Sequence, residues 1–222
     1  MNSAIIVAAG SSQRMGFDKL LAPLGGWPVI KRTIDAFENC PDIHEIIVIT
    51  SDERLKAIER LEHEECYQKL THIIHGGAER HQSVWNGLKD LNPASQYVAV
   101  HDGARPLITP EHISRCIEAA KIHRAAASAH PITDTVKRAN DSQQVSAPVD
   151  RDGLWAMETP QVFEVSLLVE AYKKILDSAD AVTDEVSAVE QLGHPIQLVP
   201  NPTPNPKITY PEDLATAEKL LP

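Results

Sequence analysis

Short apolar runs alternate with longer amphipathic stretches along this chain. An apolar run of about five residues bounded by glycine or polar residues is typical of a strand that is buried on both faces, as in a parallel sheet. Because the intervening stretches have helical spacing, the pattern predicts an α/β protein with a Rossmann-like, doubly wound and mostly parallel sheet. The runs are SAIIVAA (3–9), EIIVIT (45–50), THIIH (71–75), YVAVH (97–101) and AAASAHPI (125–132).

Helical patterns fill the intervals between these strands and continue after them. Pro110 marks the first turn of one helix and Pro211 the start of an amphipathic closing helix. A further strand, PIQLVP, is predicted at 195–200. The remaining helices are predicted at 28–39, 52–65, 80–90, 110–123, 164–177 and 183–192.

The pattern changes over residues 133–158, TDTVKRANDSQQVSAPVDRDGLWAME. Two short β-like runs flank the polar turn ANDSQQ, which predicts a projecting β-hairpin arm on a single domain that spans 1–222. A two-stranded hairpin is marginal by itself in water. We therefore expect the arm to pack against another surface, such as a second subunit.

Charge and composition limit the classes of partner. The formal net charge is −10, with 31 acidic residues against 21 basic ones and no basic patch, so we expect no nucleic-acid partner. No run approaches the roughly 20 apolar residues of a membrane span, and no signal peptide is evident, so we expect a cytoplasmic protein without a membrane partner. Cys40, Cys66 and Cys116 lie far apart, without the spacing of a zinc site or a disulfide framework.

The stretch AIIVAAGSSQRMGFDK, residues 4–19, begins as a buried strand and continues as a loop of small and polar residues. Such a loop lies at the carboxyl edge of the sheet, where backbone N–H groups approach anions, and Arg14 and Lys19 add positive charge. The spacing fits neither a Walker A loop nor a dinucleotide fingerprint, because Ser12 stands where the latter has its second glycine. An ordinary strand-to-helix turn with solvated charges is the alternative.

Two further segments follow predicted strands. HGGAERHQSVWNGL (75–88) places Gly77 before a helix that carries Arg80 and Ser83. VHDGARP (100–106) places Asp102 and Arg105 at the end of a central strand. A carboxylate in that place is a candidate ligand for Mg²⁺ bound to substrate phosphates. A local ion pair between Asp102 and Arg105 is the alternative.

Seven motifs in this order resemble the 2-C-methyl-D-erythritol 4-phosphate cytidylyltransferase family, of the nucleotide-diphospho-sugar transferase fold type. The resemblance covers nearly the whole chain and implies an enzyme of non-mevalonate isoprenoid biosynthesis that uses CTP and a polyol phosphate. The motifs are AAGSSQRM, GGAERHQSV, VHDGARP, DTVKR, DRDGLW with TPQVF, TDEVSAVEQLG and NPKITYPEDL.

The resemblance implies roles for individual residues and a Mg²⁺ cofactor near Asp102. It also implies a homodimer whose subunits exchange their arms. The implied catalytic residues are Arg14, Lys19, Arg151 and Lys207, of which Arg14, Lys19 and Lys207 meet the triphosphate. The implied sugar-phosphate ligands are Arg105, Thr135, Arg151 and Thr183. The implied nucleotide site comprises Ala8, Ala9, Gly10, Ser12, Gly77, Ser83, Asp102 and Gly103.

Some positions depart from the family pattern. Ser12 replaces the second loop glycine, and Gly103 stands where the family has alanine. The loop before Lys19 is two residues shorter than usual, which makes the opening segment more similar to molybdenum-cofactor nucleotidyltransferases.

Several functions therefore remain as alternatives. They are a cytidylyltransferase for another polyol phosphate such as ribitol 5-phosphate, a molybdenum-cofactor cytidylyltransferase, a nicotinamide-binding oxidoreductase and a catalytically silent nucleotide-binding module. The arm motifs disfavour the second. The missing glycine disfavours the third, and the charges retained for both substrates disfavour the fourth.

Overall fold

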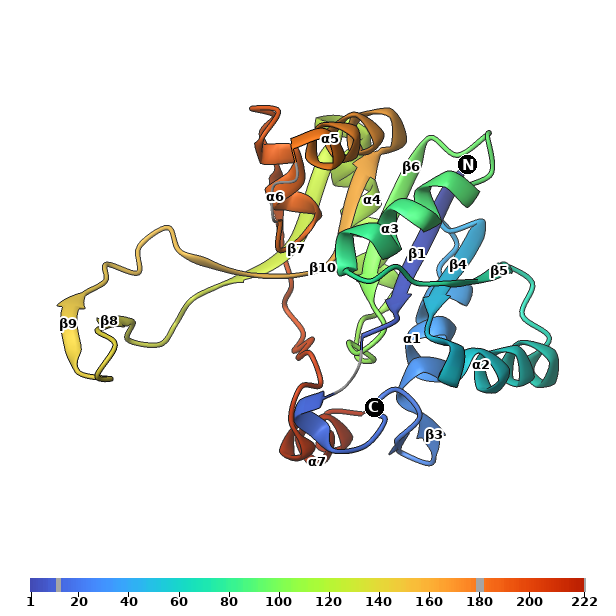
Figure 1. Cartoon of the computed structure of the whole chain (residues 1–222), viewed down its shortest axis with the longest axis horizontal. Helices are drawn as coiled ribbons and strands as arrows, with labels where there is room; N and C mark the ends of the chain where they lie inside the picture. Colours follow the sequence, from blue (N-terminus) through green and yellow to red (C-terminus); the bar gives the residue numbers. More distant parts are fainter. Residues whose placement is uncertain (11–12, 179–181, 222) are drawn as a thin grey trace.

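The computed structural model describes residues 1–10, 13–178 and 182–221. Its centre is a seven-stranded sheet in the order β11-β7-β10-β6-β1-β4-β5 (Figure 1). The strands are β1 (Asn2–Ala8), β4 (Glu45–Thr50), β5 (Leu70–His75), β6 (Tyr97–Asp102), β7 (Ala125–Pro131), β10 (Trp155–Glu164) and β11 (Gln197–Pro200).

All neighbouring pairs in this sheet are parallel except those of β10, which runs antiparallel to both β6 and β7. The predicted α/β class and mostly parallel sheet are confirmed. The chain builds outward from β1 through β4 to β5 and then returns to the other side of β1 as β6. Such a reversal leaves a crevice at the carboxyl ends of the two strands, where ligands bind in open α/β sheets.

Helices cover both faces of the sheet and create two apolar cores. Alternate side chains of β1 enter opposite cores: Ala4 and Ile6 face one, and Ile5 faces the other. The first core lies under α1 (Val29–Glu38), α2 (Asp52–Glu65) and α4 (Pro110–His123). The second lies under α3 (Arg80–Asp90), α5 (Val165–Ser178) and α6 (Glu185–Glu190).

The closing helix α7 (Pro211–Lys219) lies against a small two-stranded sheet near the opening loop. That sheet pairs β2 (Pro23–Leu24) with β3 (Trp27–Pro28). A 3₁₀ turn, η1 (Gln13–Met15), follows β1 in the chain. Among the described residues, no helix has the length and apolar content that crossing a membrane requires.

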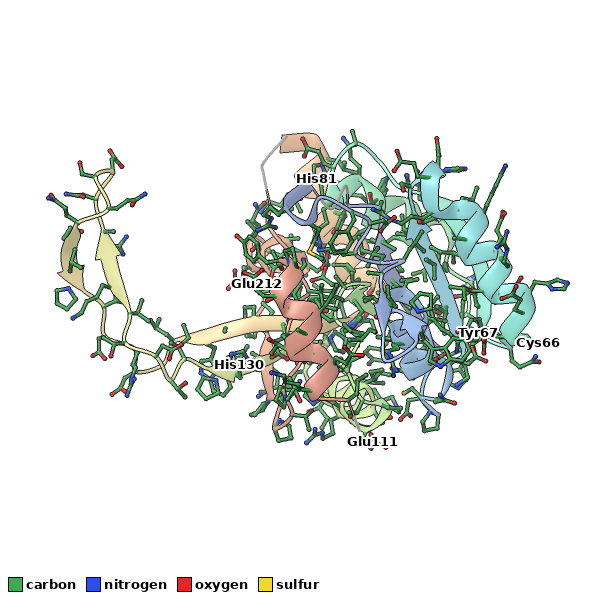
Figure 2. The ribbon with its side chains drawn as sticks, turned by 90° about the horizontal axis from the view of Figure 1, so that it is seen from below. Cys66, Tyr67, His81, Glu111, His130 and Glu212 are labelled. Atoms are coloured by element: carbon green, nitrogen blue, oxygen red, sulfur yellow. The ribbon has the colours of Figure 1, made fainter. Side chains whose placement is uncertain are left out.

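The arm leaves the body between β7 and β10 and projects far from the sheet (Figure 1). It carries β8 (Lys137–Ala139) and β9 (Val145–Pro148), which pair antiparallel as the sequence predicts. Every residue of β8 is exposed. His130, at the end of β7, lies at the base of the arm (Figure 2).

The arm ends earlier than residue 158, because Trp155–Glu164 forms strand β10 of the main sheet. The sequence does not predict this strand, since a Pro and a carboxylate inside a run argue against a central strand. The structure accommodates the proline and the carboxylate in different ways. The pairing register with β7 shifts between Met157 and Gln161, around Pro160. The buried Glu158 carboxylate accepts hydrogen bonds from Ser128 and Asn201.

Candidate functional site

A cavity of about 630 Å³ opens at the carboxyl edge of the sheet, beside the ends of β1 and β6. Its walls come from the loops after β1, β5 and β6 and from the segment before α7. The sequence-predicted residues that line it are Ala8, Ala9, Gly10, Arg14, Lys19, Gly77, Ser83, Asp102 and Lys207.

The loop after β5 is fixed by hydrogen bonds to one side chain. The Ser83 hydroxyl accepts from the Gly77 N–H at 3.0 Å and donates to the Glu79 carbonyl at 3.1 Å. A Cβ on Gly76 would lie 2.4 Å from the Ala9 Cβ, so only glycine lets this loop approach the β1 loop so closely. Two small-residue loops therefore form adjoining walls of the cavity.

Three cations surround the Asp102 carboxylate at the end of β6. Lys207 Nζ lies 2.9 Å from Asp102 Oδ2, Arg105 Nε 3.5 Å from the same atom, and Arg80 Nη2 3.6 Å from Oδ1. Burial of Asp102 disfavours its charge, but Lys207, Arg80 and Arg105 outweigh that effect and hold the pKa of Asp102 well below its usual range. The carboxylate is thus ionised at neutral pH.

Lys19 reaches the same cavity despite the shortened loop. Its Nζ donates to the Ile208 carbonyl at 2.7 Å, next to Lys207 in the chain. Burial, and then the neighbouring charge of Lys207, lower the pKa of Lys19. The opening loop and the segment before α7 therefore bring two ammonium groups to one site.

Arg54 of α2 anchors the opening loop, a role that the sequence did not reveal. This residue is only 2% exposed. Its Nε lies 2.5 Å from Asp18 Oδ2, and its Nη1 donates to the Ala8 carbonyl at 2.7 Å. Because α2 contains many charged residues, the local sequence pattern does not distinguish Arg54 or indicate this contact.

Three other residues were assigned to the nucleotide or its triphosphate: Arg14, Gly103 and Ser12. Arg14 places its guanidinium carbon 5.6 Å from the centre of the Tyr210 ring. Gly103 is not among the residues that line the cavity: its N–H donates to the Val7 carbonyl at 2.9 Å, which joins β1 to the loop after β6. Ser12 lies outside the described residues.

The predicted sugar-phosphate ligands are spread over three regions of the chain. Arg105 lines a second cavity of about 600 Å³, which shares Lys207 with the first, and donates to the Asn205 carbonyl at 2.7 Å. Thr183 precedes α6 and places its hydroxyl 3.1 Å from that of Ser187.

The remaining two predicted ligands, Thr135 and Arg151, lie on the arm, which extends away from the body (Figure 1). Arg151 donates a hydrogen bond to the Thr133 carbonyl at the base of the arm. The cavity and the arm residues thus belong to separate parts of one chain.

Two groups beside the cavity, a partly exposed arginine and a buried glutamate, received no role from the sequence. Arg80 lines the cavity, and Glu185 accepts two hydrogen bonds from its guanidinium. Burial opposes the charge of Arg80, but the adjacent Glu185 outweighs it and raises the pKa of Arg80 above its ordinary value. The motifs contain both residues, yet nothing in their spacing shows that they pair.

A doubly wound sheet with small-residue loops and clustered cations at its reversal point is typical of a nucleotide-binding protein. The sequence model of the family described as "IspD: 2-C-methyl-D-erythritol 4-phosphate cytidylyltransferase" matches residues 2–222. The chain belongs to this family.

Individual relatives agree with the family assignment. A 2-C-methyl-D-erythritol 4-phosphate cytidylyltransferase of Caldanaerobacter subterraneus is 42% identical, over 99% of this chain and 98% of its own. The crystal structure of 4-diphosphocytidyl-2C-methyl-D-erythritol synthase from Anaerococcus prevotii has a TM-score of 0.87 at 32% identity, over 99% of this chain and 95% of that one. The crystal structure of 2-C-methyl-D-erythritol 4-phosphate cytidylyltransferase from Thermus thermophilus has a TM-score of 0.81 at 28% identity, over 99% of this chain and 98% of that one.

Proposed function

We propose that this chain transfers the cytidylyl group of CTP to 2-C-methyl-D-erythritol 4-phosphate and releases pyrophosphate, as a step of non-mevalonate isoprenoid biosynthesis. The observation that carries the proposal is the gathering of Arg14, Lys19 and Lys207 with Asp102 in one cavity walled by small-residue loops. The family match supplies the identity of the two substrates.

The reaction needs positioning and charge stabilisation more than activation of a nucleophile. A phosphate monoester has its second pKa near 6 and is largely a dianion at neutral pH, so no general base has to remove a proton. One of its oxygens attacks the α-phosphorus of CTP, and the bond from that phosphorus to the bridging oxygen breaks, so that pyrophosphate leaves with the electron pair. Arg14, Lys19 and Lys207 are proposed to stabilise the charge on the triphosphate and on the leaving group.

The residues present fit a magnesium ion that arrives with CTP. Asp102, whose side chain is 11% exposed, presents an ionised carboxylate to the cavity, and Glu79, 67% exposed, is the other acidic residue of the lining. Among the described residues, no group of three or more His, Cys, Asp and Glu side chains forms a self-contained metal site. Mg²⁺ bound to substrate phosphates uses only one or two carboxylates, so Asp102 is proposed to hold it. When bound, the ion would neutralise charge on the triphosphate.

The acceptor phosphate is proposed to bind to Arg105, Thr135, Arg151 and Thr183 in a homodimer. Guanidinium forks match the geometry of a phosphate. Because Thr135 and Arg151 lie on the projecting arm, we propose that the arm of one subunit completes the active site of its partner. A partner surface would also cover the exposed β8–β9 hairpin.

The test is pyrophosphate release from CTP with a panel of acceptors that includes 2-C-methyl-D-erythritol 4-phosphate and ribitol 5-phosphate. We expect the highest kcat/KM with the methylerythritol phosphate, and a higher value with ribitol phosphate would replace the proposed acceptor. We also expect CTP to be preferred over ATP, GTP and UTP, because backbone groups around Ala8 and Gly77 are suited to read the cytosine edge. Equal turnover with UTP would contradict this second expectation.

A further inference from the structure

The Arg80 guanidinium lies between two carboxylates at the wall of the nucleotide cavity. Its Nη1 and Nη2 contact Glu185 Oε1 and Oε2 at 2.5 and 2.9 Å, a bidentate pair. Its Nη2 also lies 3.6 Å from Asp102 Oδ1. One arginine thus joins the start of α6 to the end of β6.

Glu185 is held rigidly on the side away from the cavity. It is 0% exposed and accepts a hydrogen bond from the Tyr172 hydroxyl at 2.9 Å. Tyr172 of α5 is also fully buried, and its ring stacks on Trp85 of α3 at 6.2 Å between centroids. The guanidinium of Arg80 is therefore fixed to three packed helices, α3, α5 and α6.

Lys207, which lies closest to Asp102 among the three cations, is held differently. Its side chain is 42% exposed and ends in a single ammonium group 2.9 Å from Asp102. It is free to turn toward a triphosphate. Arg80 is not, because its departure would leave the buried carboxylate of Glu185 without its ion-pair partner.

The charges of these groups explain why two carboxylates are needed. Lys207 at 2.9 Å and Arg105 at 3.5 Å already place two positive charges beside Asp102, and Arg80 adds a third, which by itself would weaken the attraction of this carboxylate for a divalent cation. Glu185 balances the charge of Arg80, so that Arg80 orients Asp102 without adding net positive charge at the site.

We propose that Glu185 is a positioning residue of the nucleotide site, which holds Arg80 and offsets its charge so that Asp102 stays both oriented and negative toward the Mg²⁺ of bound CTP. This inference rests on the proposed function. Glu185 is buried and does not line the cavity, yet by this inference it controls how strongly nucleotide binding depends on Mg²⁺.

The first test is Glu185→Gln, which keeps the size of the side chain and an acceptor for Tyr172 but removes the charge. CTP binding is measured by calorimetry over a range of Mg²⁺ concentrations without sugar phosphate. We expect the half-saturating Mg²⁺ concentration to rise about tenfold or more, since the positive charge of Arg80 beside Asp102 is then unbalanced. Tyr172→Phe is the matched control: it removes a hydrogen bond to the same carboxylate but no ionised group, and is expected to leave the Mg²⁺ dependence unchanged.

A compensating variant separates charge balance from simple structural damage. In Arg80→Gln/Glu185→Gln neither charge remains, and replacing both partners of a buried ion pair with neutral groups of similar volume is often tolerated. We expect its Mg²⁺ dependence to return to within about threefold of wild type. If Glu185 only supported the fold, the double variant would remain at least as impaired as the single one.

Arg80→Lys keeps the inference falsifiable if Glu185→Gln does not fold. It retains a positive charge for Glu185, but one ammonium group cannot make the fork that also reaches Asp102, so the Mg²⁺ requirement is expected to rise about threefold or more. The inference is overturned if a folded Glu185→Gln or Arg80→Lys protein has a half-saturating Mg²⁺ concentration within twofold of wild type. It is also overturned if the double variant raises that concentration as much as Glu185→Gln does. If wild-type protein with CTP and Mg²⁺ converts no polyol phosphate, the proposed function fails instead.

Discussion

The nucleotide cavity and the arm carry the two halves of the predicted active site, and one chain organises them very differently. In the cavity, Glu185 holds Arg80 in a bidentate pair and Lys19 donates to a backbone carbonyl, so these charges are held in place before any ligand arrives. On the arm, every residue of β8 is exposed, and Arg151 donates to the nearby Thr133 carbonyl. The body forms a preorganised site, and the arm does not.

The difference follows from where the supporting contacts come from. The cavity is built on strands whose alternate side chains enter two large apolar cores, which fix the strand ends. The arm has two short strands and no core of its own. Geometry in the cavity is therefore fixed by contacts within the body, whereas the exposed β8–β9 hairpin has little such support.

The largest expected effect is on the cavity side of the comparison. Arg14→Ala and Lys19→Ala are each expected to lower kcat by about 10²–10³-fold, because each removes a donor to charge that develops in the transition state. The KM for the sugar phosphate should change far less. Steady-state pyrophosphate release measures both parameters, with the exposed Lys56→Ala as control. A kcat within about threefold of wild type would remove the role assigned to that residue.

The next prediction involves both the cavity and the arm. Arg151→Ala and Lys19→Ala proteins, each nearly inactive, are expected to regain activity when mixed, because one site of a mixed dimer receives both wild-type groups. Random association gives about half mixed dimers, so roughly a quarter of all sites should be intact. Subunit exchange is verified by mass spectrometry or differential tagging. An exchanged mixture as inactive as its parents would show that the arm serves its own subunit.

The smallest expected effect concerns stability in acid. His101 is fully buried, contacts Thr159 Oγ1 and the Arg105 carbonyl, and has its pKa lowered to about 4 by burial. The unfolded chain binds this proton near pH 6.5 and the folded chain only near pH 4, so stability falls as the pH drops between these values. The loss reaches about 3 kcal/mol for one such histidine.

Denaturant titrations at pH 7 and pH 4.5 measure that loss. His101→Gln is expected to reduce the pH dependence but not abolish it, because burial also lowers the pKa of His112 to about 4. The arm contains no histidine between residues 133 and 153, so its substitution Arg151→Ala should leave the pH dependence unchanged. An equal pH dependence in wild type and His101→Gln would contradict the assignment.

Much of the fold was predictable because its signals are local. The predicted helices at 52–65, 80–90 and 110–123 coincide with α2, α3 and α4. One exception is β10: Glu158 and Pro160 argue against a strand, and only the partners of Glu158 and the shift in pairing register explain how the strand forms. Those partners, Ser128 and Asn201, come from distant parts of the chain.

The sequence by itself determined the α/β class, the family and the residue types available for catalysis. Each of these depends on patterns within about ten residues or on the order of motifs. Only the tertiary structure decided which charges meet. Arg80 and Glu185 are 105 positions apart, and Lys19 and the Ile208 carbonyl are 189 apart. Contacts over such separations depend on strand order and helix packing, which no local pattern encodes.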